Sequence, residues 1–413
     1  MQPVLTESQQ QVQEQQKKML LPEVTARPPH EAAALLAEYP VGVIVSVLLE
    51  LNPALTQDIL EALPGGLVEG VLQAAPAETM RQWQQNMLYA QGSIGRLMEP
   101  ALAVFRPEQT VRETVEQLRT LIKTALVTYC YVTRADGRLA GVVTMRDLLF
   151  ADDENVQLDA IMLRETFFLK PELQLGEAMK LVLDRHYPVY PVCDENGALI
   201  GQVRGQAMFE EQAFEITAQV GTMVGVEKEE RLVTPIGHSF KYRHPWLQLN
   251  LLTAFVAGAV VAIFQDTVDR LVILALFLPV LAGQSGNTGC QALAVTLRGM
   301  TLGELKAGKE KDLVAKEASL GFYNGALTGL VAALGMLAVA LYQGNPYAVM
   351  LAVVVWMALV GACVTSGICG AMIPLTLKRF GFDPATASSI FLTTATDVVS
   401  MGMLLGLAAL LVR

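Results

Sequence analysis

Cysteine, histidine and tryptophan are scarce in this chain of 413 residues, which has 5, 4 and 3 of them respectively. No two cysteines have the CxxC spacing of a zinc or thiol–disulfide site, so we interpret them as reduced packing residues. The histidines are scattered without paired metal-ligand spacing, and the sequence has no phosphate-binding loop. The sequence therefore gives no support to an enzyme.

Positive charge is also in short supply, because 40 Asp and Glu residues outnumber 30 Lys and Arg residues. The excess acid lies in residues 1–245, which hold 32 acidic and 21 basic residues, whereas residues 246–413 are nearly balanced. This balance disfavours nucleic-acid binding and suits a domain exposed to cations, with an ordinary solvated acidic surface as the alternative. Residues 1–25 lack the apolar core of a signal peptide, which predicts a flexible cytoplasmic lead-in.

The last part of the chain lacks charge over long stretches. Five apolar runs are each long enough to cross a membrane as a helix, and together they predict an all-α membrane domain over residues 246–413. Basic residues gather before the first run and after the second and fourth, so the positive-inside rule places these segments in the cytoplasm. We expect a multi-pass protein of the plasma (inner) membrane, with its amino terminus and soluble domains cytoplasmic and its carboxyl terminus outside. The runs are Trp246–Gln265, Leu271–Leu297, Ala318–Tyr342, Pro346–Leu377 and Ser389–Val412.

Two repeats divide the soluble part. Within residues 26–95, four prolines recur at intervals of 11 to 13 residues, a spacing that predicts short amphipathic helices in a superhelical domain; they are Pro40, Pro53, Pro64 and Pro76. Within residues 96–210, YVTRADGRLAGVVTMRDLLF recurs sixty positions later as PVCDENGALIGQVRGQAMFE. Each copy predicts two strands joined by a glycine turn and followed by a helix. This second repeat resembles a tandem pair of CBS domains, which implies an α/β fold.

CBS pairs commonly bind adenosine nucleotides through a hydroxyl and a carboxylate at a helix start. The first copy keeps that pattern as Thr144 and Asp147, whereas the second has Arg204 and Ala207 there. The resemblance thus implies one site for ATP or another adenosine nucleotide. The alternative, that Thr144 and Asp147 only cap a helix, stays open.

Asp397 is the only acidic or basic residue within the five apolar runs. Its position lies about 12 Å from one end of its run, hence near mid-bilayer. A charged carboxylate at this depth costs roughly 2.5–3.5 kcal/mol and usually meets a cation, a proton or water. We therefore interpret Asp397 as functional, with a polar clamp to neighbouring Ser, Thr or Asn side chains as the alternative.

Three segments of the membrane part carry a further resemblance. They read HPWLQLNLLTAF, PVLAGQSGNTGCQALAVTLRG and FGFDPATASSIFLTTATDVVSMGMLLGL. In this order, behind the helical repeats and the CBS pair, they resemble an MgtE-type magnesium channel. The resemblance implies a homodimer whose pore binds Mg²⁺ at Asp397, with the carbonyl of Thr393 also facing the ion. Asn287, in the second segment, is our candidate for a further pore-lining residue.

The resemblance also implies that acidic residues of the cytosolic domains and of a connecting helix, residues 211–245, bind cytosolic Mg²⁺ and close the pore. The candidates in this chain are Glu211, Glu215, Asp152 and Asp153. The chain departs from the family pattern at Ser285, Cys290, Ser389, Ile390 and Ser400, which leaves the ion site intact and concerns the gate. Two other functions stay open: an ion-coupled divalent-cation exporter, and a membrane-anchored nucleotide sensor that conducts nothing.

Overall fold

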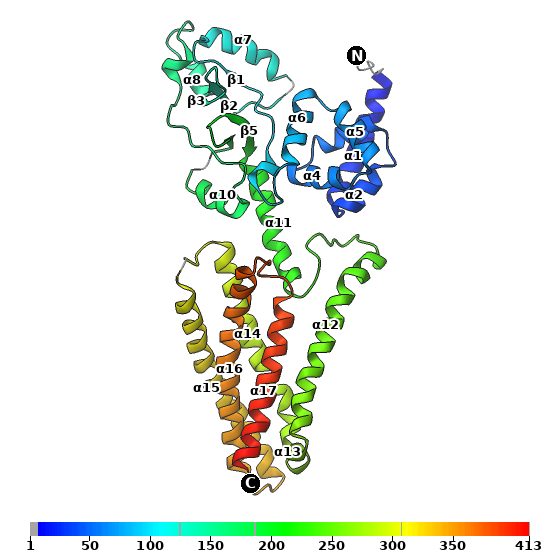
Figure 1. The fold of residues 1–413 in the computed structure, drawn as a ribbon, viewed down its shortest axis with the longest axis vertical. Coiled ribbons are helices and arrows are strands. Elements are labelled where there is room, and N and C mark those ends of the chain that lie inside the picture. Colours follow the sequence, from blue (N-terminus) through cyan, green and yellow to red (C-terminus); the bar gives the residue numbers. More distant parts are fainter. Residues whose placement is uncertain (1–6, 124, 186, 307, 413) are drawn as a thin grey trace. The chain divides into compact units, whose positions relative to one another are not determined.

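The computed structural model describes residues 7–412 except 124, 186 and 307, so the first six residues of the expected lead-in lie outside the described residues. The chain divides into two compact units (Figure 1). One is formed by the residues up to Glu215 together with Arg231–Thr234, and the other by Ile216–Glu230 and the residues from Pro235 onward. We name them after the topology expected from the sequence, the cytosolic unit and the membrane unit, and describe each by itself.

The cytosolic unit begins with a domain of short helices, in which the prolines stand at helix starts. Pro53 is the first residue of its helix, and Pro40, Pro64 and Pro76 immediately precede theirs, where the missing N–H costs no hydrogen bond. The first helix supplies part of the expected lead-in, and its Leu20 and Val24 are buried in the core of the domain. The helices are α1 (Glu7–Thr25), α2 (Pro29–Leu36), α3 (Val41–Leu48), α4 (Pro53–Ala62), α5 (Gly65–Ala74) and α6 (Ala77–Asn86).

The tandem pair follows, and its two copies have the predicted hairpins. A three-stranded sheet has the order β1-β2-β3, in which β1 (Val104–Phe105) runs parallel to β2 (Tyr129–Thr133) and β2 antiparallel to β3 (Leu139–Thr144). The second sheet pairs β4 (Val189–Cys193) with β5 (Leu199–Arg204). The other elements are η1 (Ile94–Leu97), α7 (Val111–Leu121), α8 (Met145–Leu149), α9 (Leu158–Ile161), α10 (Leu175–Val182) and α11 (Gly205–Met223).

The sequence repeat appears in the backbone of the two hairpin turns. Gly137 and Gly197 have φ values of 82° and 80°, a left-handed conformation that favours glycine. The turns pair with each other, since the Leu139 N–H donates to the Gly197 carbonyl and the Leu199 N–H to the Gly137 carbonyl. Two copies of one motif therefore face each other about an approximate two-fold axis.

Buried polar side chains join the repeat domain to the tandem pair. Arg96 of η1 is 5 % exposed, and its Nη2 lies 2.6 Å from Oε1 of Glu61 in α4. The Asn86 amide donates to the Met98 carbonyl at 2.8 Å. We call this contact the polar joint.

Among its described residues, the membrane unit has five helices that are long and apolar enough to cross a membrane, as predicted. The first begins ten residues earlier than expected, at Ile236, and the third begins at Glu310. The second expected run is divided: its start forms η2 (Val272–Leu276), and the long helix begins at Leu278, with Pro279 in its first turn. The helices are α12 (Ile236–Ile263), α14 (Leu278–Thr301), α15 (Glu310–Tyr342), α16 (Ala348–Arg379) and α17 (Ser388–Leu411), and a short α13 (Gln265–Arg270) follows α12.

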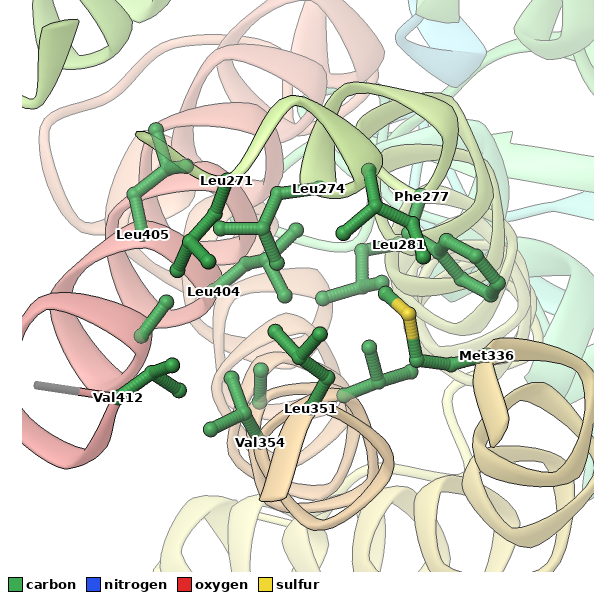
Figure 2. Packing of buried hydrophobic residues seen from close by; sticks show 14 of the residues in the cluster. Leu271, Leu274, Phe277, Leu281, Met336, Leu351, Val354, Leu404, Leu405 and Val412 are labelled. Atoms are coloured by element: carbon green, nitrogen blue, oxygen red, sulfur yellow. The ribbon is translucent and has the colours of Figure 1, made fainter. Parts of the chain in front are cut away.

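An apolar core holds one end of these helices together. Figure 2 shows Leu274 and Leu281 directed toward Leu404 of α17, Leu351 of α16 and Met336 of α15. Close backbone contact adds to this core between α15 and α16. A Cβ at Gly367 would stand 2.4 Å from the carbonyl oxygen of Glu317, so only glycine fits there. The core therefore fixes where α17 lies against its neighbours.

Candidate functional site

Asp397 lies in the middle of α17, and its side chain is half-buried. Within the described part of the chain, no hydrogen bond or ion pair reaches its carboxylate. Its backbone carbonyl accepts a hydrogen bond of 3.2 Å from Ser400 Oγ. The polar clamp considered above would need a donor to the carboxylate, so this geometry favours a carboxylate that is available to a ligand.

Thr393 lies one turn before Asp397 on the same face of α17. Its hydroxyl donates to the Ile390 carbonyl at 3.0 Å, and its own carbonyl accepts from Thr396 Oγ1 at 3.0 Å. A carbonyl has two lone pairs, and an oxygen that accepts one hydroxyl can still bind a water of a hydrated cation. The structure thus places both predicted ion-facing groups on one helix face, one turn apart.

Asn287 belongs to α14, which packs beside α17 through small residues. A Cβ at Gly286 would stand 3.9 Å from Thr396 Oγ1, and one at Gly289 would stand 2.9 Å from the Leu392 side chain. Asn287 itself is exposed on the surface of this single chain. Asn287 therefore lies on the helix that packs against α17, but its side chain is exposed instead of buried in the contact between the two helices.

The end of α11 that belongs to the membrane unit contacts α14 and α17. Gln219 Nε2 donates to Thr301 Oγ1 at the end of α14, at 2.6 Å. Ser389 Oγ at the start of α17 donates to the Met223 carbonyl at 2.8 Å. Sequence reasoning missed these contacts, because hydroxyl and amide side chains at helix ends give no signal of a partner far along the chain.

The loop after α11 holds another pairing that the sequence did not reveal. Glu230 has a side chain only 3 % exposed, and its Oε1 lies 2.6 Å from Arg243 Nη2 near the start of α12. The hydrogen bond from Arg243 keeps the pKa of the Glu230 carboxyl below its usual value. Glu230 therefore already has a cationic partner, unlike a residue that waits for a divalent ion.

A buried acid of α15 also escaped the sequence analysis. Glu317 stands one residue before the predicted third run, but α15 begins earlier and includes it, and its side chain is only 7 % exposed. Its Oε1 lies 3.7 Å from Lys316 Nζ. Asp397 is therefore not alone as a shielded acid of the membrane unit, but Glu317 has a cationic neighbour and Asp397 does not.

The predicted regulatory acids lie on two different elements of the cytosolic unit. Glu211 and Glu215 are half-buried and one turn apart on α11. Asp152 and Asp153 are exposed in the loop after α8, where Asp153 Oδ1 accepts the Asn155 N–H at 2.9 Å. The first pair is thus on a helix and the second in a solvated loop.

The predicted nucleotide residues form a capping box at the start of α8. The Asp147 N–H donates to Thr144 Oγ1 at 3.3 Å, and Asp147 Oδ2 accepts from both the N–H and the hydroxyl of Thr144, at 3.0 and 2.7 Å. In the second copy, Arg204 instead pairs with Glu99. The helix-cap alternative thus accounts for both residues, and a nucleotide would add contacts to a box that is already formed.

Comparisons with known proteins match two parts of the chain to families. Residues 278–407 match the family model MgtE, described as a divalent cation transporter, and residues 94–154 and 158–208 match the CBS domain. The magnesium transporter MgtE of Thermus thermophilus is 29 % identical over 79 % of this chain and 71 % of its own length, and that of Bacillus subtilis is 27 % identical over 85 % and 76 %.

Among solved structures, the cytosolic domain of the Mg²⁺ channel MgtE in complex with ATP is 26 % identical to this chain. It covers 46 % of this chain and 78 % of its own, with a TM-score of 0.41. By the two family models, the chain holds a tandem pair of CBS domains followed by a domain that matches the MgtE family of divalent cation transporters.

Proposed function

We propose that this protein is a magnesium channel that mediates passive influx and is gated by its cytosolic unit. The observation that carries the proposal is Asp397, a half-buried carboxylate in a membrane-length helix with no partner among the described residues. The relatives named as magnesium transporters support the choice of ion. Thr393 and Asn287 are the further residues that we assign to the pore.

A homodimer would complete the site. One carboxylate is a poor match for a divalent ion, whereas two copies of Asp397 facing a two-fold axis would supply two. Magnesium gives up its water reluctantly, so we expect a largely hydrated ion bound by two carboxylates and the Thr393 carbonyls. The exposure of Asn287 on the single chain suits a position that faces a second copy or the ion path.

The membrane potential would drive the ion inward. Moving two positive charges toward a negative interior gains roughly 4–5 kcal/mol per 100 mV, so influx needs no ATP hydrolysis. This requires the soluble domains to lie in the cytoplasm, which is the orientation that the basic connections favour.

Gating would act through α11, which runs from the tandem pair into the membrane unit. Cytosolic Mg²⁺ bound by Glu211, Glu215, Asp152 and Asp153 would offset repulsion between acidic surfaces and favour the closed pore. We assign Thr144 and Asp147 to an adenosine nucleotide that modulates this step. Unchanged binding of a fluorescent ATP analogue to Asp147→Ala would contradict that assignment.

Magnesium uptake into proteoliposomes tests the central proposal. We expect Asp397→Asn to lower uptake at least tenfold, because an amide is neutral and cannot replace a carboxylate at a divalent ion. Asp269→Asn is the matched control, since Asp269 is an exposed acid of the same unit and should leave uptake unchanged. Undiminished uptake by Asp397→Asn would refute the channel site, and uptake that depends on a counter-ion gradient would identify a coupled transporter instead.

A further inference from the structure

Ala387, the residue before α17, has an unusual backbone conformation. Its φ and ψ are 48° and 21°, and among the described residues it is the only non-glycine with a positive φ. A Cβ disfavours this left-handed region by a factor of roughly five or more relative to ordinary conformations. Ala387 is also fully buried, so its surroundings must maintain the strain.

The end of α11 provides that restraint. The Ala387 N–H donates to the Thr222 carbonyl at 2.9 Å, and Ser389 Oγ donates to the Met223 carbonyl at 2.8 Å. The last carbonyls of a helix have no partner within the helix. The loop before α17 gives the Met223 carbonyl a donor and adds a second hydrogen bond to the Thr222 carbonyl, which also accepts the Gly225 N–H. Two hydrogen bonds thus link these segments on either side of Ser388, across more than 160 residues of sequence.

The conformation of Ala387 also sets where α17 begins. It is the residue that precedes the first helical position, Ser388. Asp397 lies ten residues further along the same helix, about 15 Å away. A change of Ala387 from the left-handed to the right-handed region would add a residue to the helix and redirect its first turn.

We propose that Ala387 is a positioning residue for the pore helix, kept in its left-handed conformation only while the end of α11 is docked on it. Docking of α11 opposes the intrinsic preference of Ala387, and withdrawal of α11 releases it. The start of α17 therefore has two states, and the position of α11 selects between them. This inference rests on the proposed function only in assigning α17 to a pore.

Two substitutions should move the docking equilibrium in opposite directions. Ala387→Gly removes the Cβ that opposes the left-handed conformation, and should favour the docked state roughly fivefold. Ser389→Ala removes the hydrogen bond to the Met223 carbonyl, and should disfavour it by a factor of about two to ten. The matched control is Ala385→Gly, because Ala385 is also fully buried but has no positive φ.

Hydrogen exchange of residues 385–390 in the detergent-solubilised full chain measures docking without any transport. After correction for intrinsic rates, we expect slower exchange in Ala387→Gly, faster exchange in Ser389→Ala, and no slowing in Ala385→Gly. If Ala387→Gly exchanges no more slowly than Ala385→Gly, the proposal is overturned. The Ser389→Ala variant is an independent test, and unchanged exchange of residues 385–390 in that variant would also overturn the proposal.

Inhibition of proteoliposome uptake by cytosolic Mg²⁺ supplies a second readout. Misfolding would lower the amount of uptake, but it would not shift the inhibitory concentration in opposite directions in the two variants. We expect the cytosolic Mg²⁺ concentration for half-maximal inhibition to shift in opposite directions in Ala387→Gly and Ser389→Ala. Shifts in the same direction, or none in either variant, would contradict a positioning role. If the unmodified protein transports no magnesium while the difference in hydrogen exchange persists, the channel proposal fails and the positioning role of Ala387 stands.

Discussion

The polar joint and the middle of α17 each shield a charged side chain, but only one of the two charges has a partner. Arg96 in the polar joint is ion-paired with Glu61 at 2.6 Å, whereas Asp397 has no partner to its carboxylate among the described residues. Both shielded charges cost solvation energy. In the polar joint this cost is offset by a partner within the chain, and the difference supports our proposal that Asp397 binds a cation from outside it.

The largest effect is expected where the existing pair is broken. Glu61→Ala should destabilise the cytosolic unit by about 3 kcal/mol, because it leaves a buried guanidinium unpaired. The Nε and Nη1 atoms of Arg96 have no hydrogen-bond partner among the described residues, so no other acceptor is placed to replace the Glu61 carboxylate. Urea unfolding, with hydrogen exchange followed in α4 and α6, measures the loss.

Two controls accompany this substitution. Glu69→Ala removes an exposed glutamate from the next helix and should change stability by less than about 0.5 kcal/mol. The double variant Glu61→Ala with Arg96→Met should regain most of the loss, since no charge is then left unpaired. A double variant as unstable as Glu61→Ala would mean that packing, not charge, holds the polar joint together.

A substitution at Asp397 is expected to change the free energy of unfolding in the opposite direction. Asp397→Asn removes an unpaired charge, and in magnesium-free detergent it should raise the stability of the membrane unit by about 1–2 kcal/mol. Magnesium should stabilise the membrane unit of the unmodified protein more than that of the variant, because a ligand adds stability only through sites that bind it and the variant keeps only the proposed cytosolic sites. Thermal unfolding with and without Mg²⁺ gives both quantities, and a variant that is less stable without magnesium would show that Asp397 has a structural partner.

The sequence predicted the features that depend on short-range pattern. Hydropathy predicted five membrane helices, and an Asp-Gly or Asn-Gly turn in each copy of the repeat predicted two matching hairpins, because an apolar run and a turn motif are each read from consecutive residues. The contact of Ser389 with Met223, the pairing of Arg96 with Glu61 and the strain at Ala387 could not be predicted. Each depends on which distant segments meet, and a serine, an arginine or an alanine is compatible with many other surroundings.

The smallest expected effect concerns the pairing of Glu230 with Arg243, a shielded charge whose partner lies within the same unit. Because its pKa is lowered in the folded state, the pair contributes stability above the unfolded value of about 4.3, and this is lost as pH falls through the folded pKa. Glu230→Gln should therefore lower the stability of the membrane unit near neutral pH and flatten its decline in acid. Thermal unfolding between about pH 3 and 7 measures this, with Glu227→Gln as the control in the same loop. An equally steep acid decline in Glu230→Gln would mean that other carboxylates determine it, and the contrast with Asp397 would then rest on the polar joint alone.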